Sequence, residues 1–481
     1  MGAIPPLENL KRAHIVGVCG TLMGAFAAYL KRRGVFVSGS DENVYPPMSD
    51  VLGKAGVEIS RGYRAENLTS LKEKPDLVVI GNVIRQDNPE ARAAIDDGYA
   101  YSSLPEAMEN LFLKKTRNLV VTGTHGKTTT SSLLSHVLSR VGRDPSYFIG
   151  GVAQDLPFSF HISNLEPGSF FVLEGDEYDT AFWDKVPKFN HYLPDDVILT
   201  SIEYDHADIY PDLAAVIQAF EGLLQRIRPG GRLICCTDYV PIRDLMKKTS
   251  FPVLTYGSDT SPGARFTPAN IQHDGNRTKF EILDQGKKTD EISLSIPGHH
   301  NVLNAISAWI LCRELGIDSA KLHEALSSFR GVKRRQEERG EPRGILVIDD
   351  FAHHPTAVRE TLSALRMKYP GRRVIAVFEP RSATSRRKIF QTEYAQAFEQ
   401  ADHSFIASPY DQSRIPSEHR FSSLQLISDL EQRGKQATLF QEVEEGVAQV
   451  AKLARPGDLV AVLSNGGFGG FIPKLIEKLS S

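Results

Sequence analysis

The stretch that most constrains the fold is residues 119–130, which read LVVTGTHGKTTT. It begins as a short β-branched run, turns through two glycines and continues into a pattern with apolar residues on one helical face. A strand, a glycine loop and a helix N-terminus in this order form an anion cradle, because backbone N–H groups and the helix dipole both attract phosphate. The stretch therefore predicts a phosphate loop that contains Gly123, Thr124, His125, Gly126, Lys127, Thr128 and Thr129.

Two side chains of this loop have the chemistry that a nucleoside triphosphate requires. We expect the Lys127 ammonium to contact the outer phosphates and the Thr128 hydroxyl to ligate Mg²⁺. The general phosphate-loop pattern is not fully met, because Val121 stands where its first glycine belongs. An ordinary strand-to-helix turn with a surface lysine is the alternative, but Gly-Lys-Thr directly after a β-branched run favours the phosphate loop.

Length and charge restrict the remaining possibilities. A chain of 481 residues is too long for one hydrophobic core, and we expect three successive α/β domains at 1–113, 114–330 and 331–481. The net charge of -3 provides no field for nucleic acid or anionic lipid. No apolar run is long enough to cross a bilayer and the first residues do not resemble a signal peptide, so we expect a cytoplasmic protein. The four cysteines lack metal-ligand spacing.

The first domain shows the β-α-β-acid order of a nucleotide-binding half. A strand at 14–18 precedes Gly20 and Thr21, which open a helix, and a second strand ends in Asp41. This order predicts a diphosphate at the helix start and a hydroxyl or amide bound by Asp41. The glycine spacing differs from G-x-G-x-x-G and so argues against a dinucleotide, while a tight turn without ligand is the alternative. The loop 43–49 either connects two elements or closes over a ligand.

Acidic and histidine residues follow two strands of the central domain. The strand 170–173 runs into four acids, which predict Mg²⁺ ligation, although an acidic surface turn is the alternative. The strand 197–202 leads to Asp205 and His206. His206 either binds a second metal, shuttles protons or has a structural role only. The four acids are Glu174, Asp176, Glu177 and Asp179.

Three further segments carry candidate binding groups. Asn301 and Asn304 lie three residues apart on one helical face and can bond a base or ribose, although helix capping is the alternative. A basic segment that contains Arg335 marks a hinge into the last domain, where a guanidinium can stabilise a transferring phosphoryl group. Strands of that domain should line one crevice with their carboxyl ends. There Arg381 is a candidate for a bidentate grip on a carboxylate, or else a plain surface arginine.

In combination and order, these motifs resemble the muramyl ligases, which are ATP-dependent amide-bond ligases of peptidoglycan synthesis. The resemblance covers essentially the whole chain and rests on TGTHGKTT at 122–129, Glu174, Asp205-His206, His300-Asn301-x-x-Asn304 and DDFAHHP at 349–355. Further stretches resemble the recycling branch that joins UDP-N-acetylmuramate to L-Ala-γ-D-Glu-meso-diaminopimelate, namely 17–24, 40–49, 378–382 and 464–470. The L-alanine-adding branch and a non-catalytic ATP-binding regulator are the alternatives.

The resemblance implies a Rossmann-like UDP-binding domain, a P-loop-type central ATPase domain and a Rossmann-like C-terminal domain for the acceptor. It implies ATP and Mg²⁺ as cofactors, UDP-N-acetylmuramate and the murein tripeptide as partners, no nucleic acid or membrane, and a monomer. Lys127, Glu174, His206 and Arg335 would be catalytic, with Thr128, Glu174 and His206 as metal ligands. The nucleotide would also contact Asn301, Asn304, Arg335 and Asp350. Substrate contacts would come from Gly20, Thr21, Asp41, His353, Arg381 and Asn465.

One departure from the family concerns a carbamylated lysine that bridges the metals in several members. Between Asp212 and Gly231 the chain has no lysine, but only Arg226 and Arg228. The resemblance therefore implies that the bridge is absent, as in the L-alanine-adding branch, and leaves the full ligand set of the second Mg²⁺ open.

Overall fold

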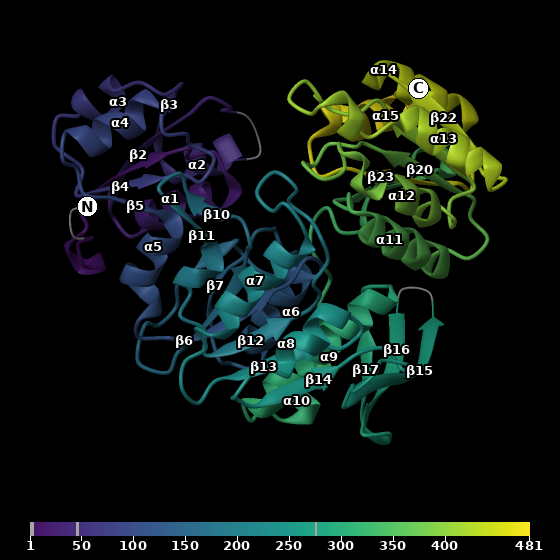
Figure 1. The fold of residues 1–481 in the computed structure, drawn as a ribbon, viewed down its shortest axis with the longest axis horizontal. Coiled ribbons are helices and arrows are strands. Elements are labelled where there is room, and N and C mark those ends of the chain that lie inside the picture. Colours follow the sequence, from purple (N-terminus) through teal and green to yellow (C-terminus); the bar gives the residue numbers. More distant parts are fainter. Residues whose placement is uncertain (1–3, 45–47, 275–276) are drawn as a thin grey trace. The chain divides into compact units, whose positions relative to one another are not determined.

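The computed structural model, drawn in Figure 1, describes residues 4–44, 48–274 and 277–481. The chain divides into two compact units. The first unit comprises Met1–Ile202, Ala214–Thr267 and Ala305–Ala325. The second comprises Glu203–Leu213, Pro268–Asn304 and Leu326–Ser481. The expected loop or lid around Tyr45, Pro46 and Pro47 lies outside the described residues.

The N-terminal part of the first unit is a five-stranded parallel sheet with strand order β3-β2-β1-β4-β5. Its strands are β1 (Arg12–Val16), β2 (Phe36–Asp41), β3 (Glu58–Arg61), β4 (Leu77–Ile80) and β5 (Tyr101–Ser103). Its helices are α1 (Thr21–Arg32), α2 (Met48–Ala55), α3 (Glu66–Thr69), α4 (Pro89–Asp96) and α5 (Leu104–Met108). The predicted order of strand, glycine turn, helix and acid-ended strand is present in β1, α1 and β2.

The central sheet of the first unit has the strand order β14-β13-β12-β6-β9-β7-β8, in which only β8 is antiparallel. These strands are β6 (Arg117–Thr122), β7 (Ser146–Phe148), β8 (Phe160–His161), β9 (Phe170–Gly175), β12 (Asp196–Leu199), β13 (Arg232–Cys236) and β14 (Val253–Tyr256). The helices are α6 (Lys127–Arg140), α7 (Leu213–Leu224) and α8 (Val240–Met246). The apolar face predicted for α6 is fully buried and comprises Leu133, Leu134, Val137 and Leu138.

A hairpin of β10 (Asp179–Ala181) and β11 (Asp184–Pro187) joins the two sheets of the first unit. Its tip residues Phe182 and Trp183 pack against the N-terminal hydrophobic cluster, and the Trp183 ring meets Tyr101 edge-on at 5.3 Å. His191, just beyond the hairpin, bonds Asp184 through Nε2 and Glu109 through Nδ1. Burial opposes a charged imidazole, but these two carboxylates outweigh it and raise the pKa of His191.

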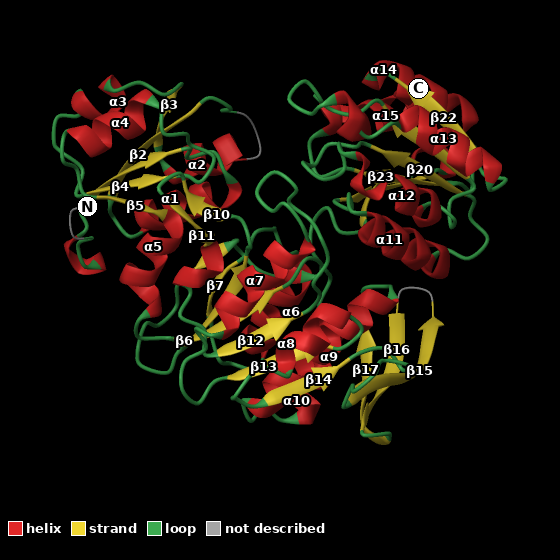
Figure 2. Cartoon of the chain, viewed as in Figure 1, coloured by secondary structure: helices red, strands yellow, loops and turns green. Residues whose placement is uncertain are grey.

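The second unit contains a six-stranded sheet with the order β18-β19-β23-β20-β21-β22. Only β18 is antiparallel to its neighbour. The strands are β18 (Glu337–Gly340), β19 (Leu346–Asp350), β20 (Val374–Phe378), β21 (His403–Ala407), β22 (Gln436–Phe440) and β23 (Leu459–Leu463). The helices are α11 (Pro355–Lys368), α12 (Gln391–Ala397), α13 (Ser423–Gln432), α14 (Val443–Leu453) and α15 (Phe471–Ser480). Figure 2 shows this sheet between helices.

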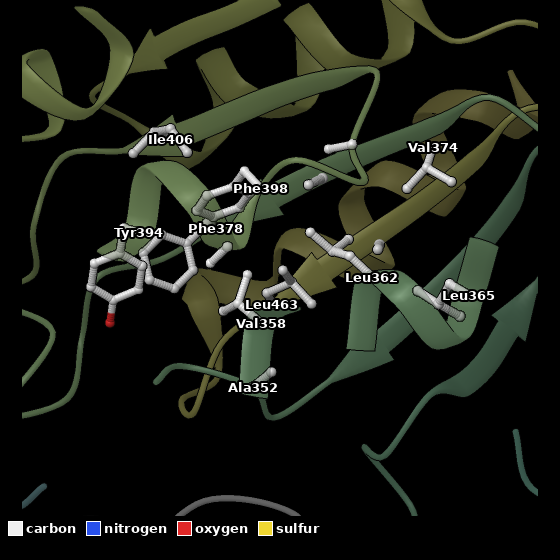
Figure 3. Close-up of a cluster of buried hydrophobic side chains, with 14 of the residues drawn as sticks. Ala352, Val358, Leu362, Leu365, Val374, Phe378, Tyr394, Phe398, Ile406 and Leu463 are labelled. Atoms are coloured by element: carbon white, nitrogen blue, oxygen red, sulfur yellow. The ribbon is translucent and has the colours of Figure 1, made fainter. Parts of the chain in front are cut away.

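Period-2 alternation along β20 produces a core on each face of this sheet. Val374, Ala376 and Phe378 pack into one cluster with residues of α11, α12 and α13, as Figure 3 shows for Val358, Leu362 and their neighbours. Ile375 and Val377 pack into the other cluster with residues of α14 and α15. Burial on both faces explains why β20 and β23 are apolar throughout, and it leaves their carboxyl ends as the place for polar loops.

Three strands were not predicted from the sequence, namely β15 (Phe266–Asp274), β16 (Arg277–Asp284) and β17 (Lys287–Leu294). Among them, β16 and β17 pair antiparallel, and β15 pairs parallel with β14. They precede α9 (His299–Glu314) and α10 (Ser319–Ser328). Cys235 and Cys236 are buried in β13. Among the described residues, no helix is both long and apolar enough to cross a membrane.

Candidate active site

The phosphate loop lies between β6 and α6 in a conformation that requires glycine. Gly123 has φ +131°, and a Cβ there would lie 2.3 Å from Thr200 Oγ1 and 2.7 Å from the Ser201 amide nitrogen. Gly126 has φ +79° and is the N-cap of α6. The segment that follows the neighbouring strand β12 holds the loop in place, because the His125 N–H donates to Ser201 Oγ at 2.8 Å. The predicted strand, glycine turn and helix are therefore present, in the geometry that could bind an anion.

The Lys127 ammonium donates hydrogen bonds to the loop backbone and to a neighbouring carboxylate. Its Nζ donates to the Gly123 carbonyl at 2.6 Å and lies 2.9 and 3.0 Å from the two Glu177 carboxylate oxygens. Burial opposes the charge, but the neighbouring carboxylates outweigh it and raise the pKa of Lys127, so the side chain is an ammonium at neutral pH. Glu177, predicted only as one of four clustered acids, is its direct counter-ion.

Thr128 and Glu174 form an oxygen-rich pair at the start of α6. The Thr128 hydroxyl donates to Glu174 Oε1 at 2.8 Å, and Glu174 Oε2 accepts the Gly150 N–H at 2.7 Å. A Cβ on Gly150 would approach Glu174 Oε1 to 3.0 Å. A hydroxyl and a carboxylate beside a phosphate loop are hard oxygen ligands, so this donor set fits Mg²⁺. Thr129 follows, half-buried, in the first turn of α6.

The candidate sugar-nucleotide residues lie together at the carboxyl edge of the N-terminal sheet. Gly20 is the N-cap of α1 and Thr21 is its first residue. Asp41, at the end of β2, accepts the Cys19 N–H and the Asn43 N–H, both at 2.9 Å. The carboxylate thus shapes the glycine turn from which the helix starts, and this role is additional to the ligand contact predicted from sequence.

Asp205 and His206 belong to the second unit, in the segment Glu203–Leu213. Asp205 is buried, accepts the His206 N–H at 2.8 Å and accepts the Thr384 hydroxyl, while His353 Nε2 lies 3.8 Å from it. Burial alone would raise the Asp205 pKa, but His353, His206 and His354 outweigh it and hold the pKa well below its usual value. His206 itself has φ +55°.

The structure distinguishes the two adjacent histidines that sequence reasoning left unranked. His354 is the N-cap of α11, where its Nδ1 accepts the Thr356 N–H at 3.3 Å. Its Nε2 lies 3.3 Å from the Tyr204 carbonyl, which places the proton on Nε2 and makes this histidine a structural connector. His353 instead bonds the Phe351 carbonyl through Nδ1 and directs Nε2 toward Asp205.

Arg334 and Arg335, which the sequence presents as equals, differ in their surroundings. Arg334 donates through Nη2 to the carbonyls of Ser464 and Gly466, each at 2.7 Å, so it fixes the loop after β23. The Arg335 guanidinium lies over the Phe351 ring at 4.9 Å. Asp350 accepts the backbone N–H groups of residues 336 and 352; its pKa is raised by burial, against the nearby Arg335 charge.

The predicted asparagine pair is on one face of α9. Asn301 donates to the Pro297 carbonyl at 2.6 Å, and Asn304 donates to Asn301 Oδ1 at 3.3 Å. Both are buried. Asn301 therefore closes the turn that begins the helix. This role resembles helix capping, which is the alternative to a nucleotide contact.

Arg381 and Asn465 lie on loops that follow β20 and β23. Arg381 Nη1 is 3.3 Å from Glu379 Oε1, and the guanidinium carbon stands 4.0 Å above the Tyr410 ring. The Asn465 Oδ1 atom is buried and has no hydrogen-bond partner among the residues that the structure describes. Tyr410, which the sequence did not single out, is the aromatic partner of the predicted carboxylate-binding arginine.

Three family models match successive parts of the chain. The model of the Mur ligase family catalytic domain matches residues 12–116, that of the Mur ligase middle domain matches 121–312, and that of the Mur ligase glutamate ligase domain matches 334–466. An Escherichia coli K12 protein is 39% identical over 98% of both chains. The chain belongs to the Mur ligase family. The α/β fold expected from the resemblance is confirmed.

Relatives of this Mur ligase carry different names. The Escherichia coli relative is named UDP-N-acetylmuramate–L-alanyl-γ-D-glutamyl-meso-2,6-diaminoheptandioate ligase. A Desulfitobacterium hafniense relative, named UDP-N-acetylmuramate–L-alanine ligase, is 34% identical and covers 94% of this chain and 96% of its own. The crystal structure of a murein peptide ligase from Psychrobacter arcticus has a TM-score of 0.72 at 31% identity, covering 98% of this chain and 99% of that one.

Proposed function

We propose that this Mur ligase joins UDP-N-acetylmuramate to the tripeptide L-Ala-γ-D-Glu-meso-diaminopimelate at the expense of ATP, in peptidoglycan recycling. The observation that carries the proposal is that Lys127, Thr128 and Glu174 surround a loop whose conformation requires glycine. The chain is also 39% identical to a ligase named for that reaction. We further propose that it acts as a cytoplasmic monomer.

The reaction proceeds in two steps. In the first, a muramate carboxylate oxygen attacks the γ-phosphorus of ATP and the bond to the bridging β,γ-oxygen breaks. The products of this step are an acyl phosphate and ADP. In the second, the peptide amine attacks the acyl carbon, loses a proton, and inorganic phosphate leaves as the C–N bond forms. Protein groups contribute mainly position and charge to such a transfer.

The roles of individual residues follow from their positions. The Lys127 ammonium has three protons, and all of them are donated to protein oxygens here. To bind the outer phosphates, Lys127 therefore has to give up its hydrogen bonds to Glu177. Thr128 and Glu174 would hold Mg²⁺, which when bound neutralises phosphate charge. His206, Asn301, Asn304, Arg335 and Asp350 complete the proposed nucleotide and metal contacts.

We assign the two remaining substrates to the outer domains. The uridine diphosphate contacts the N-terminal domain at Gly20, Thr21 and Asp41, where a helix N-terminus favours diphosphate. The peptide contacts the C-terminal domain at Arg381 and Asn465, and His353 of the same unit is a further proposed contact. The L-alanine ligase activity is the second candidate, because the Desulfitobacterium hafniense relative with that name is 34% identical.

The test is product formation by the purified protein. We expect ADP release only when ATP, Mg²⁺, UDP-N-acetylmuramate and tripeptide are present together. With ¹⁸O in the muramate carboxylate, one labelled oxygen should appear in inorganic phosphate, since the acyl phosphate transfers that oxygen to the leaving group. ADP release without either substrate, or phosphate without label, would contradict the proposed reaction.

A further inference from the structure

Three loops meet at the carboxyl edge of the C-terminal sheet, after β20, β21 and β23. The first carries Glu379 and Arg381, the second carries Tyr410, and the third carries Ser464 and Gly466. The second loop is tied to the first because the Tyr410 N–H donates to the Pro380 carbonyl at 3.0 Å. Carboxyl-edge loops of a parallel sheet are the usual place for a ligand in this class of fold.

The loops hold the Arg381 guanidinium from several sides. Tyr410 lies under its face at 4.0 Å, and Glu379 binds Nη1 at 3.3 Å. The other Glu379 oxygen accepts the Ser464 hydroxyl, whose oxygen accepts the Gly466 N–H at 2.9 Å. A guanidinium stacked on an aromatic ring and bonded at one nitrogen has lost most of its rotational freedom.

Gly466 leaves the space that the arginine occupies. A Cβ at this position would lie 2.2 Å from Arg381 Nε and 2.4 Å from its Cδ. Such distances are too short for real contacts, so any side chain at 466 displaces Arg381. The neighbouring Gly467 differs, because a Cβ there meets nothing within 4 Å.

One edge of this guanidinium is left for a ligand. Nε and Nη2 of Arg381 make no hydrogen bond to any residue that the structure describes, and the side chain is 31% exposed. These two nitrogens point their N–H groups in parallel, which is the geometry that binds both oxygens of a carboxylate. The Tyr410 ring fixes the plane in which such a carboxylate must lie.

We propose that Tyr410 and Gly466 are positioning residues that hold Arg381 as a receptor for one carboxylate of the acceptor amine. The proposal rests on the proposed function, since it assumes that the C-terminal domain binds the acceptor. It adds two residues that set acceptor specificity. The Tyr410 ring stacks on the guanidinium of Arg381, and Gly466 leaves the space that the arginine side chain needs.

The experiment measures kcat and KM for tripeptide and for ATP in five variants. We expect Arg381→Ala and Gly466→Ala to raise the tripeptide KM about 10- to 100-fold, the range of a lost charged hydrogen-bond pair. Tyr410→Ala should raise it about 10-fold, whereas Tyr410→Phe keeps the ring and stays near wild type. In each case the ATP KM should remain unchanged. The matched control is Gly467→Ala, which should behave as wild type.

A second measurement separates recognition of the acceptor carboxylate from a general loss of protein structure. Wild type should discriminate against acceptors with a carboxamide in place of one particular carboxylate, and both Tyr410→Ala and Arg381→Ala should lose that discrimination. An unchanged acceptor KM in Tyr410→Ala and Gly466→Ala, with Arg381→Ala impaired, would overturn the positioning role. If wild type used only L-alanine, the proposed function would fail, and the same variants would test the positioning role through the KM for L-alanine.

Discussion

Replacement of Lys127 by alanine is expected to lower ligation about 1,000-fold or more while UDP-N-acetylmuramate still binds. In the proposed reaction Lys127 is the cation of the phosphate loop, so its loss would remove charge stabilisation where the γ-phosphoryl group transfers. It also leaves Glu177, which is 2% exposed, without its counter-ion. The measurement is ADP release for activity and calorimetric titration with UDP-N-acetylmuramate for binding.

The matched control is Lys185→Ala, because Lys185 also pairs with an acid, Asp179, but is 67% exposed on the hairpin. This variant should retain activity, since exposed pairs contribute little. Equal loss of ligation and of sugar-nucleotide binding in Lys127→Ala would contradict the assignment of the two ligands to separate domains.

Replacement of Gly123 by alanine should collapse the phosphate loop itself. Its φ of +131° is unfavourable for alanine, and the added Cβ would meet the backbone nitrogen of Ser201 at 2.7 Å. Backbone strain and this clash together should cost about 3 kcal/mol or more in the free energy of unfolding. Nucleotide affinity should fall by at least about 100-fold, because a turn that moves no longer directs its N–H groups at phosphate.

Gly142→Ala is the control, because Gly142 also has positive φ, +79°, but a Cβ there meets nothing within 4 Å. It should cost only about 1 kcal/mol and leave nucleotide affinity unchanged. Urea unfolding and titration with ADP measure the two effects. A Gly123→Ala protein as stable as Gly142→Ala, with normal ADP affinity, would show that the loop does not need its glycine.

The sequence predicts those features that arise from local pattern. The buried face of α6, the glycine turn and the acids at strand ends follow from periodicity and from the position of polar residues after apolar runs. Rossmann-like order in the first domain is equally local, since β1, α1 and β2 are consecutive.

Partners far apart in the chain could not be predicted. Glu177 lies 50 residues from Lys127, and nothing in the acidic run marks it, rather than Asp176, as the counter-ion. Likewise, Arg334 and Arg335 are indistinguishable until the loop after β23 supplies carbonyls to one of them. The strands β15, β16 and β17 bury residues mainly at alternate positions, a weaker signal than the continuous apolar runs of the parallel strands.

The most direct test of the central claim is a single reaction that contains ATP, Mg²⁺, UDP-N-acetylmuramate and equal concentrations of tripeptide and L-alanine, with products resolved by mass spectrometry. Our account predicts that the product is predominantly UDP-N-acetylmuramoyl-tripeptide, because the relative named for that reaction is 39% identical to this chain, against 34% for the relative named for L-alanine. A product that is predominantly UDP-N-acetylmuramoyl-L-alanine would contradict it.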